Sequence, residues 1–418
     1  MVGGHQRTAA RTFIVLMGIV SLFGDMTYEG ARGLLGPYLA MLGASAASVG
    51  FVAGLGEFVG DALRLVSGQL AHRTRAWWTF VVAGYAMNIV AVPGLALAGR
   101  WEAAACLVLL ERVGKAVRSP ARSTLVSHAA TAVGVGWSFG LEEALDQVGA
   151  ITGPLLTAAV LWGARGEPID TRYRLAFGLL LLPALANLAL VLAARRRYPR
   201  PETFEHDRAV GPTPSQGPFR LFVAAAMLFG LGFADWALVA FHASRTGHFG
   251  PAMLPVLYAG VMGVDGLAAL GVGRCFDRHG LLVLAAATIV SAAYAPLVFL
   301  APSGMVVIGG AVLWGVGMGV QESVFKAAVA RLVPKDVRAR AYGVFFAWFG
   351  LAWWVGSAAM GWLYDRSIPT LIGFSVVMQL GAAALFAVLG RWLAARESLP
   401  GGRPSVSTDT RKAPKCPD

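Results

Sequence analysis

The chain has 418 residues, of which 56% are hydrophobic and only 14% are charged, and its mean hydropathy is +0.62. Soluble proteins carry about 25% charged residues, so this composition excludes a water-soluble globular fold and is typical of an integral membrane protein. The formal net charge of +12 would favour nucleic acid only if the basic residues formed one patch, but they lie in alternate loops.

Apolar windows long enough to cross a bilayer recur along almost the whole chain. A helix needs about 20 such residues to cross about 30 Å of hydrocarbon. The predicted spans are residues 12–40, 46–70, 77–99, 102–126, 134–163, 174–194, 219–242, 251–275, 281–301, 304–330, 340–364 and 369–393. The expected fold class is therefore an all-α membrane protein with twelve transmembrane helices in two pseudo-symmetric six-helix bundles.

Spans 1 and 2 contain the same ladder of ionisable residues at positions i, i+4 and i+7. The two ladders are Asp25, Glu29 and Arg32 in span 1, and Glu57, Asp61 and Arg64 in span 2. This spacing places each set on one helical stripe. An ionisable side chain near the bilayer centre costs roughly 2.5–3.5 kcal/mol, so each is expected to have a partner, a water-filled cavity or a proton.

Span 4 is the least apolar of the twelve, because its clean apolar stretch from Ala103 to Leu110 is short. Five charged residues follow, namely Glu111, Arg112, Lys115, Arg118 and Arg122. Glu111, Lys115 and Arg118 repeat the spacing of spans 1 and 2. Span 5 adds three acids, Glu142, Glu143 and Asp146.

Spans 1, 2, 4 and 5 together hold more acids than bases. The acids are Asp25, Glu29, Glu57, Asp61, Glu111, Glu142, Glu143 and Asp146, and the bases are Arg32, Arg64, Arg112, Lys115, Arg118 and Arg122. At least two carboxylates therefore lack a cation, and burial beside like charges favours their protonated form. This surplus predicts proton coupling, with Asp146, Glu142 and Asp25 as preferred carriers. The alternative for any one residue is a structural ion pair that never meets solute.

A polar, proline-containing segment from Arg195 to Pro218 divides six spans from six. The predicted organisation is an N-terminal bundle over 1–194, a cytoplasmic linker over 195–218, a C-terminal bundle over 219–395 and a disordered cytoplasmic tail over 396–418. Of the 35 lysines and arginines, 24 fall at the N-terminus, in the even-numbered connections or in the tail. Because these residues concentrate on the cytoplasmic side, both termini are predicted to be cytoplasmic in an inner (plasma) membrane protein.

The second half has a different composition where it matches the first. The positions equivalent to Glu142, Glu143 and Asp146 are Phe345, Phe346 and Phe349. The polar residues available to line a path are Asp235, His242, Asp265, Gln321, Glu322 and Lys326. An ionic wall facing an aromatic wall suits an amphipathic organic solute such as a cation. The alternatives are that these aromatics pack or face lipid, and that Glu322 and Lys326 pair with each other.

The two halves also match each other at a nearly fixed offset, as expected for an internal duplication. Val113-Gly114 matches Val316-Gly317 and Gly153 matches Gly356, both 203 residues apart. The segment from Gly68 to Arg73 matches the segment from Gly273 to Arg278 at an offset of 205.

These features together resemble the major facilitator superfamily, whose pattern is seen in Gly273-x3-Asp277-Arg278-x-Gly280 between spans 8 and 9. In the first-half copy, Gly68 to Arg73, His72 stands where an acid is usual. Gly149-x3-Gly153-Pro154 in span 5 resembles the motif of the family's antiporters, and Arg112 matches an arginine often tied to proton coupling. The resemblance implies rocking of two halves about a central site, with the third helix of each triplet facing lipid. It also implies that these motifs act in gating, through Gly68, Arg73, Gly149, Gly153, Pro154, Gly273, Asp277 and Arg278.

The function predicted is a secondary active transporter, and more specifically a proton-coupled exporter of a small amphipathic or charged organic solute. Gln321, Glu322 and Lys326 complete the predicted site. The alternatives are a proton-coupled importer or facilitator of a polar metabolite, and a non-transporting membrane sensor. An enzyme is not expected, because the nearest catalytic set, Ser119, Ser123 and His128, lies among arginines near a helix end.

The expected partners are a small-molecule substrate, protons and membrane lipid, with no nucleic acid, and the protein is expected to be a monomer. No cofactor and no metal site are expected. The three cysteines, Cys106, Cys275 and Cys416, are too scattered for a disulfide framework and are expected to be reduced.

Overall fold

The computed structural model describes residues 4–204, 217–333 and 338–397, and twelve long helical segments account for nearly all of them. The first six are α1 (Gly4–Met41), α2 (Ala46–Thr74), α3 (Trp77–Gly94), α4 (Trp101–Val133), α5 (Val135–Gly163) and α6 (Ile169–Leu179) continued by α7 (Leu181–Arg197). The last six are α8 (Gly217–Gly232) with α9 (Trp236–Arg245), α10 (Met253–His279), α11 (Leu282–Ala292) with α12 (Tyr294–Phe299), α13 (Gly304–Gly319) with η3 (Val320–Val324) and α14 (Phe325–Leu332), α15 (Arg338–Tyr364) and α16 (Ile368–Glu397). The predicted twelve-helix fold is confirmed, and the predicted tail lies outside the described residues except for Arg396 and Glu397, which end α16.

Ten of these segments are long and apolar enough to cross a membrane by composition alone, and α2 and α4 are the two that are not. Both are rich in charge, and they pack against each other. Their charged residues can therefore lie inside the bundle, where neighbouring helices supply partners. This explains why hydropathy understates span 4, which extends several residues beyond the predicted end at 126.

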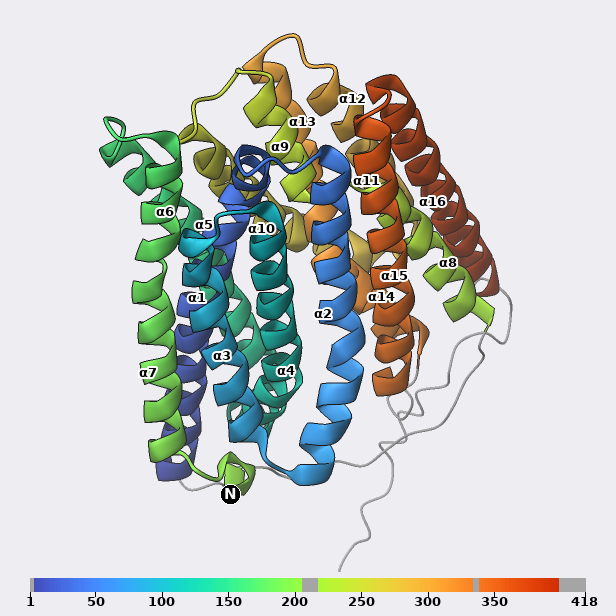
Figure 1. Cartoon of the computed structure of the whole chain (residues 1–418). Helices are drawn as coiled ribbons and strands as arrows, with labels where there is room; N and C mark the ends of the chain where they lie inside the picture. The colour runs from blue at the N-terminus through green and yellow to red at the C-terminus, as the bar shows by residue number, and fades with distance from the viewer. Residues whose placement is uncertain (1–3, 205–216, 334–337, 398–418) are drawn as a thin grey trace, which may run out of the picture.

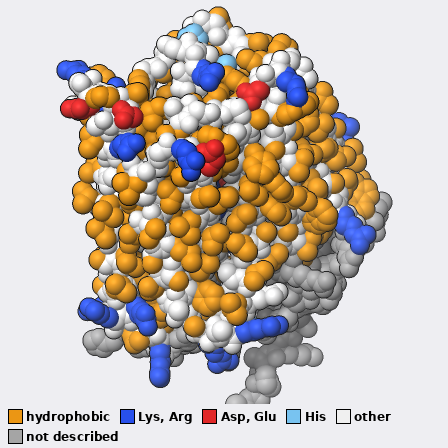
Figure 2. Space-filling view, in the orientation of Figure 1, with side chains coloured by type: hydrophobic (Ala, Val, Ile, Leu, Met, Phe, Trp, Pro, Cys, Tyr) orange, Lys and Arg blue, Asp and Glu red, His pale blue; other side chains and the backbone are white. Residues whose placement is uncertain are grey.

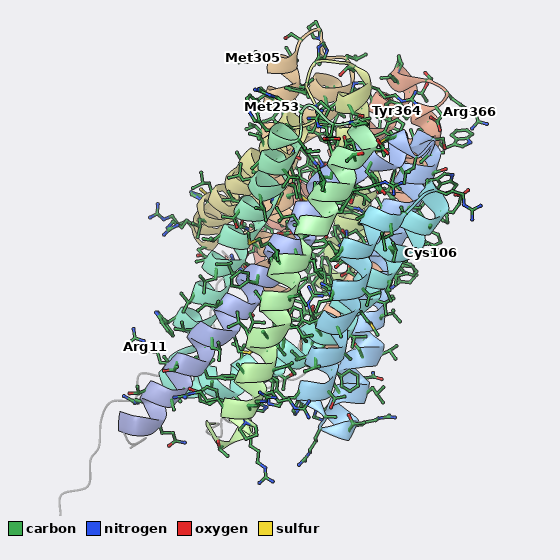
Figure 3. The ribbon with its side chains drawn as sticks, turned by 60° about the vertical axis from the view of Figure 1, so that its left-hand side comes forward. Arg11, Cys106, Met253, Met305, Tyr364 and Arg366 are labelled. Carbon is green, nitrogen blue, oxygen red and sulfur yellow. The ribbon has the colours of Figure 1, made fainter. Side chains whose placement is uncertain are left out.

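Both ends of the described chain lie at the same end of the molecule, since α1 begins and α16 ends there (Figure 1). In Figure 3, Arg11 marks this terminal end, while Met253, Met305, Tyr364 and Arg366 lie at the opposite end. Figure 2 shows lysines and arginines gathered at the terminal end below a broad apolar surface, with acids and bases mixed at the other end. The apolar surface includes exposed side chains of α7, α11 and α16, as expected of helices that face lipid.

The seventh span is interrupted between α8 and α9, where residues 233–235 are not helical. Side chains of neighbouring helices satisfy the backbone groups that this break leaves free. The Tyr294 hydroxyl lies 2.7 Å from the Ala234 N–H, the Trp314 indole donates to Ala234 O at 2.8 Å, and the Ser375 hydroxyl donates to Gly232 O at 2.6 Å. Non-helical backbone at membrane depth requires such internal partners. The break is thus held by the C-terminal helices around it.

The tenth span contains a second irregularity, a π-helical turn over Val320–Val324. This turn inserts an extra residue into the helix and includes Gln321 and Glu322. Single π turns within α-helices occur frequently at functional sites, because they re-aim side chains. Here the turn directs Gln321 and Glu322 toward the space between the two halves.

The two halves are packed closely at the end opposite the termini. A Cβ atom added at Gly36, Gly50 or Gly361 would collide with a backbone oxygen of the other half, belonging to Ala237, Ser357 or Ala46 respectively. At the same end, the Asp365 carboxylate accepts hydrogen bonds from the backbone N–H groups of Ala46 and Ala47, at 3.2 and 2.9 Å. A carboxylate from the end of α15 therefore caps the first turn of α2, where it also complements the helix dipole.

Candidate functional site

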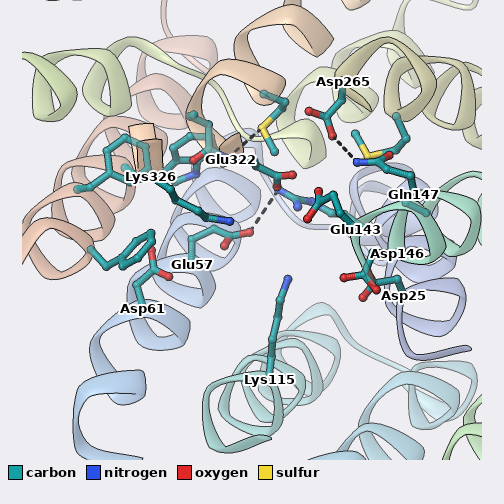
Figure 4. A pocket seen from close by; sticks show the side chains of 18 of the residues that line it. Asp25, Glu57, Asp61, Lys115, Glu143, Asp146, Gln147, Asp265, Glu322 and Lys326 are labelled. Atoms are coloured by element: carbon teal, nitrogen blue, oxygen red, sulfur yellow. Dashed lines mark hydrogen bonds and ion pairs between the residues drawn. The ribbon is translucent and has the colours of Figure 1, made fainter. Parts of the chain in front are cut away.

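A cavity of about 210 Å³ lies between the two halves, and Figure 4 shows the side chains that line it. Its lining consists of Asp25, Arg32, Glu57, Asp61, Arg64, Lys115, Glu143, Asp146, Gln147 and Ala150 from the first half, and Met262, Asp265, Met318, Gln321, Glu322, Lys326, Phe346, Phe349 and Trp353 from the second. On α1, α2 and α15, the lining residues are nearer the terminal end than the residues of the close contacts. The cavity therefore lies on the terminal side of the closed interface.

An ion-pair network at the deep end of the cavity joins α1, α2, α4 and α9. The carboxylate of Glu57 lies 3.2 Å from Arg32 Nη2 and 3.0 Å from Arg112 Nη2. Arg32 Nη2 also lies 3.2 Å from Asp235 Oδ2. Asp235 uses its other oxygen to accept from the Ala237 N–H at 2.9 Å, so it caps α9 directly after the helix break. The break thus fixes the acid that connects Arg32 to the second half.

Tyr28 organises the cations of this network. Its hydroxyl is hydrogen-bonded by Arg112 and, at 3.1 Å, by Arg32. The Nζ of Lys115 lies 4.1 Å from the centre of the Tyr28 ring, within the range of a cation–π interaction. One aromatic side chain therefore holds three cations around the inner end of the cavity.

Seven carboxyl groups but only four basic groups line the cavity. The acids are Asp25, Glu57, Asp61, Glu143, Asp146, Asp265 and Glu322, and the bases are Arg32, Arg64, Lys115 and Lys326. Among the described residues, Glu57, Asp61 and Asp146 form ion pairs, whereas Asp25, Glu143, Asp265 and Glu322 form none within 4 Å. The lining has an excess of negative charge whenever its acids are ionised.

Asp25 and Asp146 lie next to each other on one side of the cavity (Figure 4). The nearest ion-pair partner of Asp146 is Arg122 Nη2 at 3.7 Å, while Arg122 pairs more closely with Glu142 at 2.8 Å. Two neighbouring carboxylates repel each other when both are ionised, so a shared proton or a bound cation stabilises them. A proton or a cation held between Asp25 and Asp146 would therefore relieve their mutual repulsion.

The opposite wall is aromatic and contains two methionines. Phe346, Phe349 and Trp353 of α15 face the cavity together with Met262 and Met318. The remaining aromatics of this helix do not contribute in the same way. Phe345 packs against Phe222, with ring centroids 5.6 Å apart, and Trp348 is half exposed on the outer surface. Both alternatives raised for these aromatics thus apply, each to different residues.

Eleven of the sixteen residues expected at a substrate or proton site line this cavity. They are Asp25, Arg32, Glu57, Asp61, Arg64, Lys115, Glu143, Asp146, Gln321, Glu322 and Lys326. The other five are Glu29, Glu111, Arg112, Arg118 and Glu142, and none of them is in the lining.

Each of these five has a described partner elsewhere. Glu29 accepts a hydrogen bond from the Tyr258 hydroxyl at 2.5 Å, across the two halves. Glu111 pairs with Arg112 at 3.6 Å, and both line a separate small cavity of about 30 Å³ beside Tyr28. Arg118 lies over the Tyr85 ring at 4.6 Å and so faces α3. Glu111, Lys115 and Arg118 are therefore not a single stripe toward the cavity, because α4 is packed against α3 and α2 as well as α1.

Four polar residues that the structure brings to the site are not among the sixteen predicted site residues. Asp235 and Asp265 are predicted only as polar residues available to line a path, and the sequence patterns do not indicate Gln147 or Tyr28. Gln147 Nε2 donates to Asp265 Oδ2 at 3.4 Å and so connects α5 to α10. Helical spacing could have indicated two of them. Tyr28 lies one helical turn before Arg32, and Gln147 lies one turn after Glu143, so each shares a helix face with a predicted site residue.

The predicted gating motifs lie away from the cavity. Gly149 and Gly153 contact the backbone of α1, where a Cβ atom would collide with Leu22 O or Met26 O, and Pro154 follows within α5. Gly68 lies against the Pro120 side chain of α4. Arg73, Asp277 and Arg278 are exposed at the terminal ends of α2 and α10, and Gly273 has no neighbour within 4 Å of a Cβ atom among the described residues. These glycines of α5 serve close helix packing.

Comparison with known proteins adds a family match over most of the chain. The profile of the family described as the Major Facilitator Superfamily matches residues 14–357. An uncharacterized protein of Mycobacterium tuberculosis is 44% identical over 384 residues, covering 90% of this chain and 92% of the relative. An uncharacterized MFS-type transporter of Methanocaldococcus jannaschii is 24% identical over 386 residues, covering 89% and 94%.

Solved structures of the same architecture cover nearly the whole chain. A bacterial homolog to the human lysosomal transporter Spinster, solved in an inward-facing and unoccupied conformation, aligns with a TM-score of 0.71 and 13% identity over 93% of this chain and 98% of that one. A peptide transporter in complex with sulfate aligns with a TM-score of 0.70 and 15% identity over 92% and 94%. At this low sequence identity, the similarity to these structures establishes the fold alone.

Proposed function

This chain belongs to the Major Facilitator Superfamily, and we propose that within it the protein is a proton-coupled exporter of a small amphipathic organic cation. It is an integral membrane protein and a secondary transporter rather than an enzyme. Substrate class, coupling ion and direction are the proposed elements. The excess of carboxyl groups over basic groups in the cavity lining is the observation on which the proposal depends.

The lining favours a cation with an apolar or aromatic part. Asp25, Glu143 and Asp146 supply negative charge on one side, while Phe349 and Trp353 supply π faces on the other. A cation near an aromatic face gains about 0.5–2 kcal/mol, more as water is excluded. A neutral polar metabolite would leave the unpaired carboxyl groups without compensation, so the importer of such a metabolite is the weaker alternative.

Proton coupling follows from competition for the same carboxyl groups. When Asp25 and Asp146 hold a proton, the negative charge that attracts the cation is reduced, and when the cation binds, the proton is released. Glu142, expected on sequence grounds to share this role, is instead the partner of Arg122 at 2.8 Å and is not in the lining. Asp25 and Asp146 are therefore the carriers that we assign.

Alternating access would expose this cavity to one side at a time. With the termini placed in the cytoplasm by the distribution of basic residues, the close contacts of Gly36, Gly50 and Gly361 form the closed outer gate. The cavity then belongs to the cytoplasmic side, where an exporter loads its substrate. Export rather than import also takes support from the resemblance of Gly149-x3-Gly153-Pro154 to the antiporter motif.

Transport into proteoliposomes under an imposed pH gradient tests the proposal. Ethidium, a cationic aromatic dye, would be compared with a neutral sugar and an organic anion. We expect gradient-dependent accumulation of ethidium alone, and loss of the gradient dependence in Asp146→Asn. The matched control is Asp170→Asn, which neutralises an exposed acid in the first turn of α6, away from the cavity.

Three results would contradict the proposal. Preferential transport of the sugar or the anion would overturn the substrate class. Unchanged pH dependence in both Asp146→Asn and Asp25→Asn would overturn the assigned coupling. Absence of transport for every class tested would favour the membrane sensor.

A further inference from the structure

A second cavity, of about 580 Å³, lies at the surface of the terminal end, where α3 begins and α7 ends. It is lined by Arg75, Ala76, Trp77, Trp78, Thr79, Leu192, Arg195, Arg196 and Pro199. Three arginines and no acid line it. None of these arginines forms an ion pair within 4 Å with any residue that the structure describes. The cavity is therefore strongly positive.

The tryptophans give this cavity a polar donor as well as an apolar wall. The Trp78 indole N–H donates to Tyr198 O at 3.2 Å, which ties α3 to the end of α7. Trp77 is only 8% exposed, and its indole N–H has no hydrogen-bond partner among residues 4–204, 217–333 and 338–397. The indole nitrogen itself is not fully buried, so it is free to donate to a ligand acceptor in the cavity in place of water.

The start of α3 is likewise uncapped. Its N-cap residue, Ala76, has no side chain that can accept a hydrogen bond, whereas α2 begins with Ser45 and receives Asp365. The first N–H groups of a helix and the dipole behind them attract an anion. The uncapped N-terminus, the Trp77 indole and the three guanidinium groups all converge on one cavity.

Arg75 is held in a costly conformation beside this cavity. Its φ of 52° lies in the left-handed region, which glycine adopts at helix ends without strain. An arginine adopts this conformation at a cost that glycine avoids, so its presence here is consistent with a role for the guanidinium group. Phosphate oxygens are partners that guanidinium groups bind in bidentate geometry.

We propose that this cavity binds the phosphate group of an anionic phospholipid at the membrane surface. A lipid is favoured over a soluble phosphate compound because Leu192, in the cavity wall, begins an exposed apolar face of α7. Leu192, Leu185 and Leu182 are 36%, 47% and 62% exposed, and their spacing places them along one side of the helix. The acyl chains would lie along this face while the headgroup occupies the cavity.

Native mass spectrometry of the delipidated full-length protein tests the proposal, with phosphatidylglycerol and phosphatidylcholine of identical acyl chains as probes. Each arginine near an anionic headgroup contributes enough that its removal should weaken phosphatidylglycerol binding about fivefold, or roughly 25-fold for Arg195→Gln with Arg196→Gln. The control is Arg73→Gln with Arg197→Gln, which removes one charge from the end of α2 and one from the end of α7, both outside the cavity lining. It should change binding less than about twofold.

Arg75→Gly provides a variant whose folding is not at risk. It removes one guanidinium group and relieves the positive φ, so we expect weaker phosphatidylglycerol binding with an unchanged or higher midpoint of thermal unfolding in lipid-free detergent. Equal weakening by the cavity and control pairs would overturn the proposal in favour of general surface charge. Equal binding of phosphatidylcholine would show that the charge of the headgroup does not determine binding. Competition by inorganic phosphate at equal concentration would show that the occupant need not be a lipid.

Discussion

In the first half, α5 presents Glu143 and Asp146 to the central cavity, whereas in the second half α15 presents Phe346 and Phe349 from positions 203 residues later. The preceding position is turned away from the cavity in both halves. Glu142 forms an ion pair with Arg122 at 2.8 Å, and its counterpart Phe345 contacts Phe325, with ring centroids 6.2 Å apart. Arg122 and Phe325 are also 203 residues apart.

The helix packing behind these side chains has been kept in both halves. Gly153 of α5 meets Met26 O of the first span, and Gly356 of α15 meets Leu231 O of the seventh. The duplicated backbone therefore determines which positions face the cavity, while the chemistry at those positions differs. Under the proposed function, charge and proton handling belong to the first half, and apolar contact with the solute belongs to the second.

Replacing Arg122 in the first half and its counterpart Phe325 in the second should lower the free energy of unfolding by unequal amounts. Arg122→Leu leaves Glu142 and Asp146 without their cation, and breaking a largely buried ion pair destabilises by about 3 kcal/mol. Phe325→Leu only removes apolar volume and should lower the free energy of unfolding by about 1 kcal/mol. Thermal unfolding in detergent measures both, and equal losses would show that Arg122 has no electrostatic role.

A second variant places the aromatic pair of the second half, Phe325 and Phe345, at the equivalent positions 122 and 142 of the first half. Arg122→Phe combined with Glu142→Phe should recover part of the stability lost in Arg122→Leu, because apolar residues of similar volume replace buried ion pairs well. Gradient-driven transport should stay impaired, because Asp146 loses its nearest cation. Restored proton coupling in this double variant would contradict the division of roles.

The aromatic wall should affect affinity and leave coupling intact. Phe349→Leu removes one π face from the cavity and should raise the apparent KM for ethidium about fivefold, corresponding to about 1 kcal/mol. The pH dependence of transport should match that of the unaltered protein. A KM that stays constant while the pH dependence shifts would reverse the roles assigned to the two walls.

The smallest effect is expected at the closed end, where the two halves meet directly. Asp365→Ala removes the acceptor of the Ala46 and Ala47 N–H groups, and losing a helix cap costs about 1 kcal/mol. The fraction of molecules in which the two halves are separated at this end should rise about fivefold. Spin labels at Ser45 and Ser367 would report it by pulsed distance measurements, and an unchanged distance distribution would show that the cap does not hold this end closed.

Much of the fold and part of the site were predictable from local patterns. The span boundaries depend on hydropathy and loop charge, and the i, i+4, i+7 spacing correctly brought Asp25 and Arg32, and Glu57, Asp61 and Arg64, to one cavity. The spacing failed for span 4, because Arg118 is attracted by the Tyr85 ring of α3 and no sequence period encodes a neighbouring helix.

The helix irregularities were beyond sequence reasoning for a related reason. Nothing in Gly232-Phe233-Ala234-Asp235 demands a break, which becomes stable only because Tyr294, Trp314 and Ser375 satisfy the backbone there. That break makes Asp235 both the cap of α9 and the partner of Arg32. The π turn that contains Gln321 and Glu322 is equally a product of tertiary packing.

Proton movement during ethidium transport is the most direct test of the central claim that Asp25 and Asp146 exchange a proton for a cation. Proteoliposomes with a pH-sensitive dye in the lumen and no initial pH gradient would receive external ethidium. The account predicts that the lumen becomes more alkaline as ethidium enters, and that the change is lost in Asp25→Asn combined with Asp146→Asn. Ethidium entry with a constant or more acidic lumen would contradict it.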